Sequence, residues 1–173
     1  MSMTTQQQTA LESLAGRALT EGEVTSIGAL VDAWDTQGIA DALSVGRTRV
    51  EPRLISERGV RALPVLPRSR HALLSELASA ATAAPAWLVP TLTAVGVPAD
   101  DHDAYAADLA SAHGWLLNAD GLDVGAPAAR AMLDMIAIAV PATAAACTAV
   151  KALAEHPDPI THMQVALALQ GAA

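Results

Sequence analysis

The chain has 173 residues, of which 52% are hydrophobic, 2% aromatic and 16% charged, and its formal net charge is −8. The length favours one domain, or one domain with a small appendage. The apolar fraction excludes a disordered tail or linker protein. A core of Ala, Leu, Val and Met, with no Phe, suits closely packed helices better than a β-sandwich, so we predict a mainly α fold.

The N-terminal part predicts three short helices, over about residues 5–15, 21–34 and 36–43. Thr20 and Glu23 have the spacing of a capping box, in which each side chain satisfies a free backbone N–H of the other's residue. Apolar residues after this box recur at helical spacing and predict a helix of about three turns.

The segment 45–51 is the best strand candidate, because charged and apolar or Thr side chains alternate until Pro52 ends the run. A lone strand leaves backbone groups unpaired, so it needs a partner. We expect either residues 122–124 or the same segment of a neighbouring subunit.

Further helix start signals follow at Ser56, Ser69, Asp100, Pro127, Pro141 and Thr161. In total we expect a bundle of seven or eight short helices with at most one tiny two-stranded β element. The expected organisation is an N-terminal helical part, 1–62, with a basic extended segment at 45–62, and a C-terminal helical part, 63–173. We expect the two parts to form one compact unit.

Two uncharged stretches, 77–99 and 135–150, raise the question of a membrane span. Three prolines interrupt the first, and the second is short and contains Pro141. A membrane role is therefore disfavoured. The polar start of the chain lacks the basic and apolar regions of a secretory signal, and the single cysteine, Cys147, fits a reducing compartment.

Charge asymmetry is the strongest local signal. Segment 47–70 has net charge +5, whereas the rest of the chain has net charge −13. Its basic residues are all arginine, whose planar group binds carboxylate or phosphate through two hydrogen bonds. They are Arg47, Arg49, Arg53, Arg58, Arg61, Arg68 and Arg70.

Three interpretations of this segment remain open. It is a solvated loop, or it docks on the acidic face of a neighbouring subunit, or it binds nucleic acid. The acidic remainder of the chain favours the second and would repel phosphates. No aromatic residue lies between the arginines to stack on bases. Trp34 and Trp87 are the expected aromatic anchors of such contacts, and Trp115 is a core or interface residue.

No catalytic, metal or cofactor site is expected. The acids at 100–103 fit the positive end of a helix dipole better than a metal cluster. His102 and His113 lie three turns apart, too far for the usual zinc pair. His156 and His162 flank a proline-stiffened connection, and Cys147 is expected to be a buried thiol.

Four segments resemble small helical proteins encoded by tailed bacteriophages and prophages: Ile39–Val50, Ile55–Gly59, Gly121–Pro127 and Lys151–Pro159. Together they cover about a fifth of the chain, and the middle, about 63–119, has no such resemblance. The resemblance implies a protein of the structural-gene neighbourhood, located in the virion and made in the host cytoplasm. It implies no catalytic or binding residue.

The sequence thus predicts a non-enzymatic virion protein, of the tail or neck, that self-assembles or docks on another phage structural protein through its arginines. One alternative is a phage-encoded regulator that binds a host protein or nucleic acid. A holin-like membrane protein is a further alternative, which the prolines disfavour.

Overall fold

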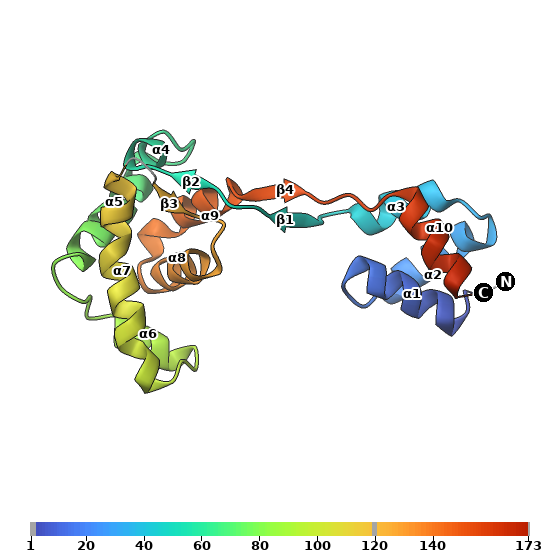
Figure 1. Ribbon diagram of the computed structural model, residues 1–173, viewed down its shortest axis with the longest axis horizontal. Helices are drawn as coiled ribbons and strands as arrows, with labels where there is room; N and C mark the ends of the chain where they lie inside the picture. Colours follow the sequence, from blue (N-terminus) through green and yellow to red (C-terminus); the bar gives the residue numbers. More distant parts are fainter. Residues whose placement is uncertain (1–2, 119–120, 173) are drawn as a thin grey trace. The chain divides into compact units, whose positions relative to one another are not determined.

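The computed structural model describes residues 3–118 and 121–172. By its internal contacts the chain divides into two compact units. Unit 1 consists of Met1–Arg49 together with Pro157–Ala173, and unit 2 is Val50–His156. In Figure 1 the last helix, in red, lies beside the blue N-terminal helices of unit 1.

Unit 1 contains four helices that share one feature, a side chain that caps the first turn. They are α1 (Thr5–Ala15), α2 (Glu21–Asp32), α3 (Thr36–Ser44) and α10 (His162–Gly171). Thr4, Thr20 and Thr161 form complete capping boxes. The predicted box at Thr20 and Glu23 is confirmed.

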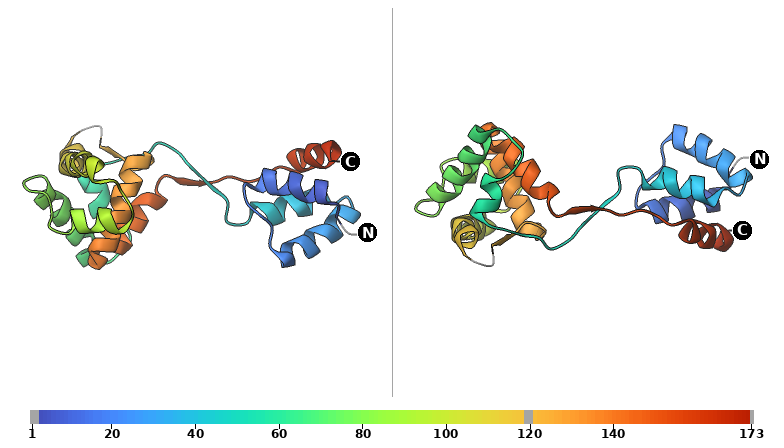
Figure 2. Two further views of the ribbon diagram at one scale, coloured as in Figure 1. Left: turned by 90° about the horizontal axis from the view of Figure 1, so that it is seen from below. Right: turned by 90° about the horizontal axis from the view of Figure 1, so that it is seen from above.

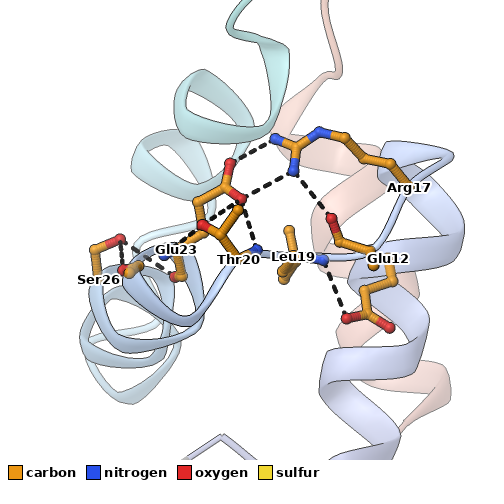
Figure 3. Close-up of polar contacts among 8 residues, drawn as sticks. Glu12, Arg17, Leu19, Thr20, Glu23 and Ser26 are labelled. Carbon is orange, nitrogen blue, oxygen red and sulfur yellow. Dashed lines mark hydrogen bonds and ion pairs between the residues drawn. The ribbon is translucent and has the colours of Figure 1, made fainter.

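The turn between α1 and α2 is held by a network of polar contacts (Figure 3). Arg17 Nη1 donates to Glu23 Oε2 at 2.9 Å, and the backbone N–H of Thr20 donates to the same oxygen at 2.9 Å. The backbone N–H of Leu19 donates to Glu12 Oε1 at 3.1 Å. The hydrogen bond from Arg17 is the largest cause that lowers the pKa of Glu23 to about 2.

The core of unit 1 joins the two ends of the chain. Leu11 and Ile39 from the N-terminal helices pack in one cluster with Ile160, Val165 and Leu169 from the C-terminal segment. The buried positions recur at helical spacing within each helix. Which helices share a core is a tertiary property, and it places α10 with the first three helices.

Unit 2 contains the other six α-helices of the described residues. They are α4 (Glu57–Arg61), α5 (Pro67–Ala80), α6 (Leu88–Ala94), α7 (His102–Leu117), α8 (Pro127–Ala139) and α9 (Ala144–Ala152). Two 3₁₀ turns, η1 (Ala99–Asp101) and η2 (Pro141–Thr143), precede α7 and α9. Figure 2 shows these helices gathered around one another in two further views.

Proline begins several of these helices, because its fixed φ suits the first turn, where its missing N–H costs no hydrogen bond. Pro67 is the first residue of α5, and Pro127 is the first residue of α8. Ser69 was expected to cap α5, and this expectation is wrong. Its hydroxyl is buried and accepts from the backbone N–H of Ala146 at 3.1 Å, so it joins α5 to α9.

The β structure consists of two short pairs in the described residues. β1 (Thr48–Val50) pairs with β4 (Glu155–Pro157), and β2 (Leu54–Ile55) pairs antiparallel with β3 (Leu122–Asp123). In the second pair Leu54 is opposite Asp123 and Ile55 is opposite Leu122.

The predicted strand partner needs a correction. Segment 45–51 does not pair with 122–124, because β1 pairs with β4 and the 122–124 segment pairs with β2. Pro52 lacks an N–H and splits the extended run into two strands. β4 was missed because it has no alternating apolar residues and ends at a proline.

The mainly α class with a tiny β element is confirmed. The described residues form ten α-helices, more than the seven or eight expected. One of them, α6, begins without a side-chain cap, so no start signal predicts it. The observed division also differs from the expected parts 1–62 and 63–173, since unit 1 is discontinuous in sequence. Among the described residues, no helix combines the length and the apolar character that a membrane span requires.

Candidate functional site

Arg47 stabilises unit 1 from within. Its Nη2 lies 2.6 Å from Asp158 Oδ2, its Nε donates to the Asp158 carbonyl at 3.2 Å, and its Nη1 donates to the Leu14 carbonyl at 2.8 Å. The side chain is 29% exposed. These three contacts occupy most of its donors, so its role is to join the segment after α3 to α1 and to the segment before α10.

Arg61 and Arg70 also serve the fold. Arg61 forms an ion pair with Glu57, one turn earlier in α4. Arg70 Nη1 donates to the carbonyls of Arg61 and Leu63, at 2.5 Å and 2.9 Å, which lie at and just after the end of α4. Arg61 therefore stabilises α4 itself, and Arg70 fixes the end of α4 against the start of α5.

Three arginines remain available. Arg53, Arg58 and Arg68 are exposed, and the described residues provide no hydrogen bond or ion pair to their side chains. All three belong to unit 2. Arg49 is exposed as well, but it has an interaction within the chain. We call Arg53, Arg58 and Arg68 the free arginines.

The two predicted tryptophan anchors differ in exposure. Trp34 is 52% exposed, and its φ of 52° places it in the left-handed region, which is unusual for a large residue. Trp87 is half-buried against the core of unit 2, and its Nε1 donates to Glu76 Oε1 at 2.6 Å. Trp34 therefore has the exposure of a surface anchor, whereas Trp87 is part of the interior.

Four acidic side chains lie before and within α7. Asp100, Asp101, Asp103 and Asp108 are all exposed, and within residues 3–118 and 121–172 none has an ion pair. The aspartates at the helix start fit the expected interaction with the helix dipole. The described residues include no group of His, Cys, Asp and Glu suited to a metal ion.

A pocket of about 340 Å³ lies beside this acidic helix, in unit 2. Its lining is mainly apolar and includes Trp115, Leu54, Leu122, Met132 and alanines of the α8 start. Trp115 and Leu54 are 42% and 59% exposed. A volume of this size is typical of small binding sites.

Two carboxylates lie at the pocket, and their surroundings differ. Asp123 Oδ1 accepts from the backbone N–H groups of Arg53 and Gly125, at 2.8 Å and 2.9 Å, so it joins the residue before β2 to the turn after β3. Asp108 is exposed and has no partner in the described part of the chain. Asp108 is therefore the carboxylate available to a bound cation.

The pocket was not predicted from the sequence, because three separate segments form it. Trp115 from α7, Leu54 from β2 and Met132 from α8 become neighbours only in the folded chain. One signal was present: Trp115 falls off the stripe of Leu109, Ala112 and Leu116 that packs into the core of unit 2. Together with exposed Leu54 it forms adjoining exposed apolar surface, which is the kind of feature that marks binding sites.

Cys147 is buried, as predicted. Desolvation raises the pKa of its thiol to about 11, and a weak hydrogen bond to Thr143 opposes this only in part. The group is therefore a protonated core residue and a poor nucleophile.

No protein-family model, curated protein or solved structure matches this chain. Its function has therefore to be argued from its own surface.

Proposed function

We propose that this protein is a non-enzymatic structural protein of a tailed bacteriophage, of the virion tail or neck, that assembles through arginine–carboxylate contacts. In this proposal the free arginines of one molecule contact exposed aspartates of a second copy or of another phage structural protein. The bacteriophage assignment is supported by the resemblance of the segments at 39–50, 55–59, 121–127 and 151–159.

One observation favours docking on carboxylates over a solvated loop or nucleic-acid binding. Among the exposed side chains of unit 2, three arginines and four aspartates have no ion pair within the described residues. Arginine is favoured at interfaces because its guanidinium is weakly hydrated and binds carboxylates in a fixed geometry. Complementary charge also speeds association and selects the partner.

The proposal predicts that assembly depends on the free arginines. The variant with Arg53→Gln, Arg58→Gln and Arg68→Gln should keep its helical circular dichroism and lose its higher-mass species in sedimentation velocity. The expected loss should also occur in the wild type at high salt, since exposed ion pairs are screened. If the wild type assembles and the variant has the same mass distribution, the proposal is contradicted.

A control variant separates contact from net charge. Gln6→Glu, Ser13→Glu and Ala29→Glu change the net charge by the same amount and lie at exposed positions of unit 1. This variant should assemble as the wild type does. Arg47 is left unchanged in both, because its contacts with Asp158 and Leu14 belong to the fold.

The virion location has its own test. Mass spectrometry of purified particles from a host that carries the gene should detect the chain at a fixed ratio to other virion proteins. Its absence from particles, with presence in the host cell, would instead favour the regulator.

A further inference from the structure

We propose that the pocket beside α7 is the receptor half of a self-contact, and that it takes Leu66 of a second copy, with Arg68 of that copy at Asp108. This inference rests on the proposed assembly and names its partner. It concerns a specific apolar site, which the arginine–carboxylate proposal does not require.

The chemistry of the pocket defines its occupant. Trp115, Leu122 and Met132 provide an apolar lining with space for one or two aliphatic side chains. Asp108 at the same pocket is a carboxylate without a partner in the described residues. The occupant should therefore be a large apolar side chain with a cation close by in its sequence.

The chain itself presents such a segment. Among the large apolar side chains exposed in unit 2, two lie within two residues of a free arginine: Leu54, beside Arg53, and Leu66, two residues before Arg68. Leu54 lines the pocket and cannot also fill it. Leu66 is 60% exposed and is the residue that precedes the first turn of α5.

The surface next to the pocket allows a close approach. The exposed residues of α7 between Asp103 and Trp115 are mostly small: Ala104, Ala107, Ser111 and Gly114. A chain that packs along them meets little steric resistance, and the aspartates before and within α7 then face its basic residues. A contact that joins one patch of a molecule to a different patch of a second copy is heterologous, and it can extend to a ring or a filament.

Two substitutions test the two halves of the contact. Leu66→Ser removes the apolar side chain, and the fold should tolerate it because Ser is favoured at a residue that precedes a helix. Ala128→Phe fills the pocket from an exposed lining position of α8. Each should raise the self-dissociation constant about ten- to a hundredfold, the effect expected for one buried leucine side chain.

Matched controls distinguish the site from general surface effects. Ala131→Phe places the same side chain at an exposed position of α8 outside the pocket, and Val89→Ser removes another exposed apolar residue of unit 2. Both should associate as the wild type does. Equal losses in the variants and the controls would overturn the inference.

Mixing provides the decisive measurement. The Leu66→Ser variant retains its pocket, and the Ala128→Phe variant retains its leucine. At a concentration where neither variant associates alone, an equimolar mixture of the two should form a 1:1 complex. Sedimentation velocity with one variant fluorescently labelled detects this complex. Absence of a mixed complex overturns the pocket contact.

The outcomes separate this inference from the proposed function. Loss of assembly in the free-arginine variant, with normal assembly in Ala128→Phe, would retain the proposed function and reject the pocket. A wild type that stays monomeric at all concentrations would also reject the self-contact. Detection in virions would then support docking on another phage protein.

Discussion

Units 1 and 2 differ in how they use polar residues. In unit 1 the polar residues mainly serve the fold: four side chains cap helices, and Arg17 and Arg47 contact carboxylates and carbonyls of the same unit. Unit 2 has the larger apolar core, and it leaves three arginines and four aspartates exposed without ion pairs in the described residues. Unit 2 also has ion pairs that serve its fold, such as Arg130 with Glu155 and Lys151 with Asp134, so the difference lies in the further exposed charges that unit 2 presents to a partner.

The largest expected effect concerns the two cores. Leu11 and Leu109 are fully buried in units 1 and 2, and truncating either to Ala should cost about 2–5 kcal/mol of unfolding free energy. Because unit 1 has the smaller core, Leu11→Ala should expose its amides to hydrogen exchange while unit 2 stays protected. Leu167→Ala, at a 63% exposed position, is the control. If the amides of both units lose protection together, the two units unfold as one cooperative structure and do not differ in stability.

The next prediction compares Arg47 in unit 1 with Arg61 in unit 2, two arginines that form contacts within their own unit. Arg47→Met removes an ion pair and two hydrogen bonds to carbonyls, and it should destabilise unit 1 by about 1–3 kcal/mol. Arg61→Met removes an exposed pair within one helix and should cost at most about 1 kcal/mol. Urea unfolding of both variants measures the difference. Similar costs would mean that the carbonyl contacts of Arg47 contribute little.

A smaller effect concerns helix starts. Thr20→Ala removes a capping box in unit 1 and should cost about 1 kcal/mol. In unit 2, α5 starts without a side-chain cap, so Leu66→Ser should leave stability unchanged or raise it slightly. Thermal unfolding of both variants tests this difference between the units. If Leu66→Ser lowers stability as much as Thr20→Ala does, the two helix starts do not differ.

The smallest effect is a pH dependence in unit 1. The pKa of Glu23 falls from its ordinary 4.5 to about 2, first because of the hydrogen bond from Arg17. A carboxyl group whose pKa is lower in the folded state stabilises that state fully above pH 4.5, and this contribution is lost as the pH falls towards 2. Glu23→Gln and Arg17→Gln should each flatten the stability profile in this range. Denaturant unfolding at pH 2–5 measures this. If the free energy of unfolding of the variants falls with pH as steeply as that of the wild type, the assignment is contradicted.

The sequence by itself determined the class and the local detail. Ala and Leu at helical spacing indicated a mainly α fold, and the start signals at Thr20, Ser56 and Thr161 are confirmed as caps. These features are local, because a cap acts over three residues and a helical stripe over two or three turns.

The tertiary structure decided the rest. Only the folded chain shows that α10 shares a core with α1, that β1 pairs with β4 rather than with 122–124, and that Arg47 meets Asp158. The same holds for the pocket that joins Leu54, Trp115 and Met132. Such contacts link residues far apart in sequence, and many alternative pairings bury similar apolar area, so no local pattern selects among them.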